Sequence, residues 1–299
     1  MKIPIPEVEQ NGYTEESLLK SIIQLSNLIT KKARVNNPSQ AIDNIDGYFL
    51  LMVERILIQA QTTLEVIEKH QDYNTVCALV RLMADNICIV KLIYDEPDIN
   101  ERELRHYLYL MDGLKLRKSE LEKPHKPYDG RIPKDTFDQL MKQMKDALEN
   151  TNTAISVCMI HIRNNPLYAK YPQLIEKLVQ QRNWQYDKLN TGNYKTPKPK
   201  WNELYKKVGL EEPEMYSYLS QYVHGLSVSN LPTTSKDDYN APCSFAVCLM
   251  GSLFQILRSK YKTVMHDITH EELLALLSTC PDKHLKELFG KLCLQNPEE

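Results

Sequence analysis

The chain has 299 residues, of which 42% are hydrophobic and 25% are charged, so its composition is that of an ordinary globular protein and excludes a disordered one. Its formal net charge of −2 excludes a general electrostatic attraction to nucleic acid or to an anionic membrane, and any such binding requires a local basic patch. The seven cysteines form no C-x-x-C pair, which argues against a disulfide framework or a zinc ribbon.

Two segments bear on localisation. Residues 1–13 hold prolines and acidic residues where a signal peptide would need an apolar core, so we expect a cytoplasmic protein. Residues 239–257 contain no charge, but they include Asn240, Pro242 and Ser244, whereas a membrane span needs about 20 predominantly apolar residues. We therefore predict a buried core helix there and no membrane contact.

Three long helical patterns open the chain. The first begins at the capping residue Thr14, and its apolar residues recur at helical spacing until a basic run. The second is predicted over residues 41–68 with Ser39 as its cap. The third starts after the capping residue Asp72 and ends before Pro97, because the residue before a proline is pushed out of the helical region.

Two further long helices follow. The fourth is capped by Asp98 or Asn100 and combines one apolar stripe with densely charged other faces, so one face must be solvated. A basic loop at 124–133 leads to the fifth helix, predicted over 135–163. Long helices with mostly short connections are typical of an antiparallel helical bundle, so we predict an N-terminal bundle over residues 1–163.

The remaining chain is less regular. Residues 164–299 are predicted to form a C-terminal helical part packed on the bundle, with a linker or surface insertion near 183–200. A single domain remains the alternative. Helices are expected over 172–182, 201–207, 213–225 and 242–265, and from Thr269 and Pro281. With only nine glycines and few β-branched runs, the sequence predicts an all-α fold.

The third helix, VCALVRLMADNICIVKLIY at 76–94, is apolar on most sides yet carries Arg81, Asp85 and Asn86 at its centre. Arg81 and Asp85 are four residues apart and share one face of the helix. Because burial of a charge is costly unless the charge is paired or faces water, the two residues form either an internal ion pair or the wall of a polar pocket. In a pocket, Arg81 would bind an anion while Asp85 holds it in place.

A second polar stripe lies about 130 residues later. Tyr216, Ser220 and His224 are spaced i, i+4 and i+8 and share one face of a helix. Histidine is suited to acid–base work near neutral pH, and the hydroxyls can position a substrate or a phosphate. The alternative is a histidine hydrogen-bonded inside the protein.

Other polar residues give weaker signals. Arg117, and Arg105 with Asp112, would point inward from the fourth helix, but a solvated charged face is favoured. His266 and His270 have the spacing of metal ligands, and a metal-dependent hydrolase is therefore a third option. Because no third ligand is evident, exposed histidines are favoured, and we expect neither a metal nor a cofactor. Basic loops with aromatic residues, at 123–131 and 194–201, have the composition used in single-stranded RNA binding.

Three motifs carry a family resemblance: RLMADN at 81–86, LYLMDGLKLR at 108–117 and YSYLSQYVHG at 216–225. Together they resemble a family of uncharacterised, all-helical bacterial proteins, a domain of unknown function, over about residues 40–260. The resemblance implies an all-helical fold and no particular activity. It also implies that five residues act as a set: Arg81, Asp85, Tyr216, Ser220 and His224.

The chain is also remotely similar to the HEPN ribonucleases of toxin and phage-defence systems, in which an Arg is followed by a His after four to six residues near a helix start. Arg102 and His106 come nearest to this pattern, but only three residues separate them. This departure argues against RNA cleavage by the HEPN mechanism.

These observations lead to two hypotheses, and they leave open whether the protein is an enzyme. In the first, a cytoplasmic bacterial protein, possibly of a toxin or phage-defence system, acts on RNA or a nucleotide at a polar pocket, with His224 as the acid–base group and Arg81 as the phosphate stabiliser. In the second, it is a non-catalytic interaction or regulatory module with a protein partner or a second copy of itself. The predicted site comprises the catalytic residues His224, Ser220, Arg81 and Asp85 and the binding residues Tyr216, Arg117 and Asn86.

Overall fold

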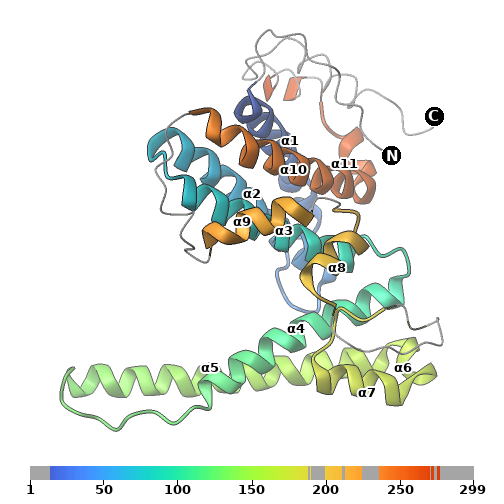
Figure 1. Cartoon of the computed structure of the whole chain (residues 1–299). Helices are drawn as coiled ribbons and strands as arrows, with labels where there is room; N and C mark the ends of the chain where they lie inside the picture. The colour runs from blue at the N-terminus through green and yellow to red at the C-terminus, as the bar shows by residue number, and fades with distance from the viewer. Residues whose placement is uncertain are drawn as a thin grey trace. The chain divides into compact units, whose positions relative to one another are not determined.

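The computed structural model describes residues 14–187, 189, 199–210, 213–223, 236–269, 271–272 and 275–276. Every regular element in these residues is a helix, so the all-α prediction is confirmed. Figure 1 shows these helices, of which α1 to α5 and α10 are the long ones.

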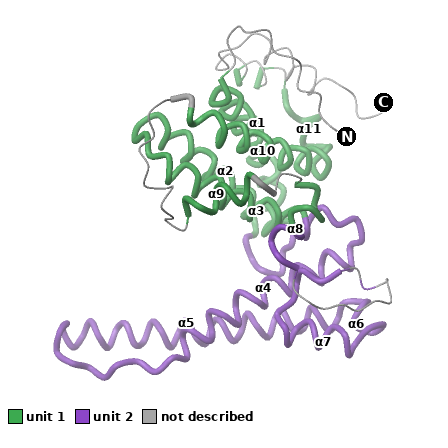
Figure 2. Tube along the Cα trace, in the orientation of Figure 1, with its two compact units in different colours: residues 1–39, 46–91, 205–299 green, residues 40–45, 92–204 purple. Residues whose placement is uncertain are grey.

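The chain divides into two compact units (Figure 2). Unit 1 combines residues 1–39, 46–91 and 205–299, and unit 2 combines residues 40–45 and 92–204. The predicted boundary at residue 163 coincides with no division between these units, because segments far apart in the sequence pack together within unit 1.

Unit 1 contains α1 (Glu15–Asn36), α2 (Ile45–Lys69) and most of α3 (Tyr73–Tyr94), which are followed much later by α9 (Pro213–Val223), α10 (Asn240–Lys260) and α11 (Lys262–His266). The short α8 (Trp201–Lys207) leads into its second part, and a 3-10 helix, η3 (Lys236–Tyr239), precedes α10. The core of α3 is fully buried at Val80, Met83, Ala84 and Ile87.

Several predicted helix starts are confirmed by their hydrogen bonds. The Thr14 hydroxyl accepts from the Ser17 backbone N–H, and Asp98 accepts from the first N–H groups of the fourth helix. Thr269 and Glu272 form a reciprocal capping box. The prediction of Ser39 as a cap was wrong, because α2 begins only at Ile45. The helix predicted near Pro281 lies outside the described residues.

Helix α10 is the one helix in the described part of the chain that is long and apolar enough to cross a membrane by length and composition. Half of that apolar window is buried inside the protein, and α10 packs along α1 (Figure 1). Core helices of soluble proteins have the same length and apolarity, so this feature alone does not define a membrane protein. The expected cytoplasmic localisation stays a prediction.

Unit 2 is built on a helical hairpin. Helix α4 (Ile99–Leu121) packs against α5 (Lys134–Asn164), and the rings of Tyr107 and His161 stack between them with centroids 4.4 Å apart. The short α6 (Pro166–Lys170) and α7 (Pro172–Gln181) cover only the end of the hairpin that contains the α5 C-terminus, and its other end extends away from them (Figure 2). The start of α5 therefore has α4 as its main neighbour.

A buried histidine joins the segment 40–45 to the rest of unit 2. His106 is fully buried, its Nε2 lies 3.0 Å from the Ile42 carbonyl oxygen, and its Nδ1 lies 2.9 Å from the Tyr94 hydroxyl. A carbonyl only accepts, so Nε2 carries the proton and Nδ1 accepts from Tyr94. Burial lowers the pKa of His106 to about 4, against the smaller opposing effect of the Ile42 carbonyl.

This neutral histidine predicts a loss of stability in mild acid. The folded pKa lies below the unfolded value, so the unfolded chain binds more protons between about pH 6.5 and pH 4, and stability falls as the pH is lowered through that window. Between about pH 7.5 and pH 5 the loss from His106 is about 2 kcal/mol. Urea unfolding of the wild type and of His106→Gln should show a shallower pH dependence in the variant; parallel pH profiles would contradict this role.

Candidate functional site

The structure brings together three of the four residues predicted to be catalytic. Arg81 on α3 forms an ion pair with Asp85 through Nη1, and its Nε donates to Oγ of Ser220 at 3.1 Å. Ser220 lies on α9, 139 residues further along the chain. The Arg81 and Asp85 side chains are 15% and 26% exposed, so the pair is partly buried but reachable from solvent.

Two tyrosines complete this group of residues, which we call the Arg81 cluster: Arg81, Asp85, Tyr205, Tyr216 and Ser220. The Tyr205 hydroxyl donates to Asp85, and the Arg81 guanidinium lies 5.4 Å from the centroid of the Tyr205 ring. Tyr216 stacks on Tyr205 with centroids 3.8 Å apart. Burial, together with the hydrogen bond to Asp85, raises the pKa of Tyr205, so its hydroxyl stays protonated and remains a donor.

A ladder of tyrosine hydroxyls positions α9 against α3. The Tyr73 hydroxyl on α3 lies 2.7 Å from that of Tyr218, which lies 3.0 Å from that of Tyr222. The rings of Tyr73 and Tyr222 meet edge to face. Because Tyr218 and Tyr222 lie on the same helix as Ser220, these contacts help to hold Ser220 beside Arg81.

The hydrogen bonds of Ser220 define its chemistry. Its hydroxyl donates its one proton to the Tyr216 carbonyl oxygen at 2.8 Å and accepts from Arg81. In this arrangement Ser220 orients the guanidinium, and none of its hydrogen bonds to the described residues pairs it with a base that would activate it as a nucleophile. Arg81 uses two of its five N–H groups in the contacts found among the described residues, so three are left to bind an anion.

The other predicted site residues either make contacts outside the Arg81 cluster, belong to unit 2, or lie outside the described residues. The Asn86 amide donates to Gln59 on α2 at 3.1 Å, so it joins α2 to α3. Arg117 is on α4 in unit 2, where it lines an open groove. His224 lies outside the described residues, which end at Val223 in α9. Its proposed role as the acid–base group therefore stays a prediction.

The other two histidine patterns are the metal-like spacing of His266 and His270 and the HEPN-like spacing of Arg102 and His106. No group of three or more His, Cys, Asp or Glu side chains that could hold a metal ion occurs in the described part of the chain. His266 is exposed, and His270 lies outside the described residues. Arg102, the partner of His106 in the HEPN-like spacing, donates from Nε and Nη2 to the Glu96 carbonyl oxygen, while His106 is buried.

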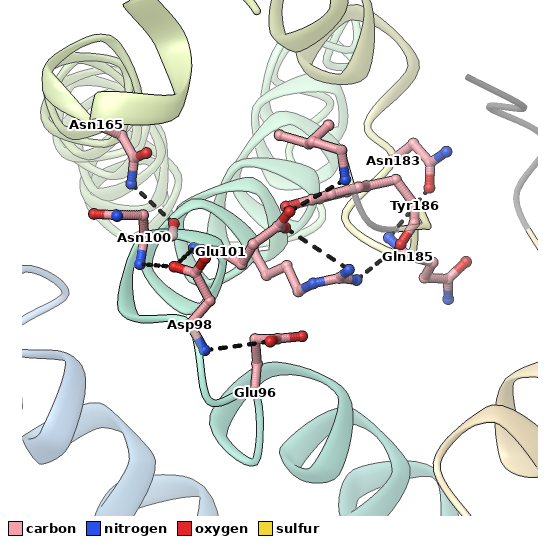
Figure 3. A network of polar contacts seen from close by, with 10 residues as sticks. Glu96, Asp98, Asn100, Glu101, Asn165, Asn183, Gln185 and Tyr186 are labelled. Atoms are coloured by element: carbon pink, nitrogen blue, oxygen red, sulfur yellow. Dashed lines mark hydrogen bonds and ion pairs between the residues drawn. The ribbon is translucent and has the colours of Figure 1, made fainter. Parts of the chain in front are cut away.

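Unit 2 contains a second charged network that the sequence analysis missed (Figure 3). Arg105 and Glu101 are 1% and 2% exposed, and Nη2 of Arg105 lies 3.9 Å from Oε2 of Glu101. Oε2 of Glu101 accepts from the Tyr186 hydroxyl at 2.6 Å, and Oε1 accepts from the Leu189 backbone N–H at 3.2 Å. Nη1 of Arg105 donates to the Tyr186 carbonyl oxygen at 2.9 Å.

This network corrects the prediction that Arg105 belongs to a solvated charged face of the fourth helix. Arg105 is among the largest fully buried side chains, and Asp112 pairs with Arg182 across 3.5 Å. The i, i+4 spacing of Glu101 and Arg105 was a usable signal, but it also describes a solvated surface pair. The sequence does not show that the chain at 186–189 covers the pair, and only that covering distinguishes the two cases.

Comparison with known proteins does not assign the site: no family model, no curated protein and no solved structure matches the chain. The resemblance to a family of uncharacterised helical bacterial proteins, and the remote similarity to HEPN ribonucleases, stay predictions.

The ion pair in the Arg81 cluster predicts a measurable coupling. Arg81→Met leaves Asp85 with Tyr205 as its donor among the described residues, and Asp85→Leu leaves a partly buried cation without its anion. The double variant removes both charges and should lose less stability than the sum of the two single variants, by roughly 1 kcal/mol. Urea unfolding of the four proteins measures this coupling, and additive losses would contradict it.

Removal of one charge from the Glu101–Arg105 network in unit 2 should lower the unfolding free energy by more than the coupling expected in the Arg81 cluster. Glu101→Ala leaves the Arg105 guanidinium buried without its carboxylate, and we expect a loss of about 3–5 kcal/mol in unfolding free energy. Arg105→Met combined with Glu101→Leu should recover most of it, because a matched apolar pair needs no counter-ion. Thermal unfolding tests both; a Glu101→Ala protein as stable as the wild type would show that the charge is not effectively buried.

Proposed function

We propose that the Arg81 cluster binds a phosphate group of RNA or of a nucleotide. The observation that carries the proposal is the contact of Arg81 with Ser220, which joins two motifs far apart in the sequence. It supports the proposal because a guanidinium that is already fixed from two sides, and is still partly exposed, loses little conformational entropy when it binds a phosphate bidentately.

Two further contacts hold the guanidinium in position for a phosphate. The Tyr205 ring beneath the guanidinium limits the movement of Arg81, and Asp85 holds Nη1 without using the remaining donors. In this proposal His224, one helical turn after Ser220 in the sequence, is the acid–base group of an RNA-cleaving or nucleotide-cleaving reaction. Arg81 then stabilises the charge that develops on the phosphate.

The proposal is tested by nucleotide-binding calorimetry and an RNA-degradation assay on the purified protein. Arg81→Ala should weaken phosphate binding at least about tenfold. His224→Ala should lower cleavage by about 10²-fold or more and leave binding nearly unchanged. Arg55→Ala is the matched control, because Arg55 is an exposed arginine on α2 of the same unit. A wild type without binding or cleavage, or an active Arg81→Ala protein, would refute the proposal.

The cellular setting is part of the same proposal: the bacterial and defence context rests on the two resemblances, and the cytoplasmic localisation rests on the composition of residues 1–13. A cytoplasmic bacterial protein that acts on RNA in a toxin or phage-defence system should slow growth when it is overproduced. The His224→Ala protein should relieve that effect at equal expression. Growth curves of the two strains test this, and equal growth would contradict the defence role.

A second candidate function is a non-catalytic interaction or regulatory module, and one observation favours it. Asp85 accepts from both Arg81 and Tyr205, and Ser220 donates its proton to the backbone, so much of the cluster is satisfied internally. Under this alternative the Arg81→Met, Asp85→Leu double variant folds and keeps its function. Loss of function in a stably folded double variant would count against it.

A further inference from the structure

The end of the α4–α5 hairpin differs in charge from the rest of the protein. We call residues 115–145 the hairpin end; they comprise the last part of α4, the connecting loop and the first part of α5. The hairpin end contains nine Lys and Arg against five Asp and Glu, a net charge of +4, whereas the whole chain has −2. It is therefore a local basic patch of the kind that polyanion binding requires in a protein with a negative net charge.

The cations of the hairpin end are accessible. Every residue from 122 to 136 is exposed, and the Arg131 side chain is 84% exposed. Its ion pair with Asp129 is a surface pair that contributes about 0–1 kcal/mol and exchanges readily for a phosphate. Lys126, Lys142 and Lys145 have no carboxylate partner among the described residues.

An aromatic side chain lies within this charge. Tyr128 is 41% exposed, and its ring is supported by Phe137, with centroids 5.4 Å apart. Nζ of Lys134 lies 5.3 Å from the centroid of the same ring. The loop turns back at Gly130, whose φ of +77° is unfavourable for other residues. A supported, half-exposed ring beside cations is a surface on which an unpaired base can stack.

A groove on the flank of the hairpin adds hydrogen-bonding groups. It has a volume of about 370 Å³, within the size range of small-molecule sites, and apolar side chains of Leu114, Ala147 and Ala154 form part of its lining. The polar side chains that also line it are Arg117, Gln143, Asp146, Asn150 and Thr151. Amides pair with base edges and arginine pairs with phosphate, so this lining suits a nucleotide unit of a strand.

We propose that the hairpin end and this groove form a binding surface for single-stranded nucleic acid, with Tyr128 stacking on a base and with Arg117, Lys126 and Arg131 contacting phosphates. The excess positive charge, the stacking surface of Tyr128 and the two amides of the groove, Gln143 and Asn150, together match an unpaired strand. An acidic protein helix would use the charge but not the exposed ring and the amides. The surface belongs to unit 2 and does not depend on the Arg81 cluster.

The experiment is fluorescence anisotropy of the full chain with a labelled single strand of about 16 nucleotides, as RNA and as DNA, over a range of salt concentrations. Lys126→Glu with Arg131→Glu should weaken binding at least about tenfold and make the salt slope less steep by about 1.4, since each phosphate contact on a single strand contributes about 0.7. Arg117→Ala should weaken binding less, because one contact is lost.

Two controls separate specific contacts from net charge and from folding. Lys20→Glu with Lys31→Glu changes two exposed lysines on α1 of unit 1 and gives the same net charge, and it should bind as the wild type does. Tyr128→Ala should weaken binding about tenfold by loss of stacking, whereas Tyr128→Phe keeps the ring and should stay within about twofold. All of these positions are exposed, and wild-type thermal unfolding of each variant verifies the fold.

Three results would overturn the proposal. They are absence of binding by the wild type at about 50 mM salt, an equal loss in the α1 control, and competition by a duplex as effective as that of the single strand. Tighter binding of RNA than of DNA would add a contact to the 2′-hydroxyl, and equal binding would assign the affinity to phosphates and bases; both support the proposal. The Arg81→Met, Asp85→Leu protein should retain strand binding, so failure of either site is recognised separately.

Discussion

The ion pair between Arg81 and Asp85 is the constraint on which the arrangement of α3, α8 and α9 depends. Both charges lie partly buried on a largely buried helix, so the elements that pack beside them must supply polar partners. Tyr205 from α8 donates to Asp85, and Ser220 from α9 accepts from Arg81. The stacking of Tyr216 on Tyr205 then joins α8 and α9 to each other. A single pair of charges thus determines which residues of two later helices can lie against α3.

In unit 2 a more deeply buried pair of charges also requires polar partners. Glu101 and Arg105 are covered by the chain around Tyr186, which supplies a hydroxyl, a carbonyl and an aromatic face 4.2 Å from the guanidinium. Nε of Arg105 is buried without a hydrogen-bond partner among the described residues. The two pairs differ in solvent exposure. Arg81 is partly exposed and can bind an external anion. Arg105 is buried, and it holds Tyr186 against α4.

The two proposed binding surfaces follow different principles. At the Arg81 cluster, a guanidinium fixed by protein contacts would recognise one phosphate through geometry. At the hairpin end, several exposed cations and one supported ring would recognise a strand through charge and stacking, with strong dependence on salt. A helical hairpin whose end packs mainly on itself presents such residues without disturbing a core, because few of them are buried.

The sequence by itself determined the all-α fold, because apolar residues recur at helical spacing and the caps Thr14, Asp98 and Thr269 follow local rules of hydrogen bonding. It also identified Arg81, Asp85, Tyr216 and Ser220, because charged residues in an apolar helix and polar residues at helical spacing can be recognised from the sequence alone. The tertiary structure alone decided that Arg81 meets Ser220, that Tyr205 joins them, that Asn86 turns to Gln59, and that Glu101 and Arg105 are buried. These outcomes depend on which distant segment covers each helix face, and spacing along one helix carries no information about its neighbours.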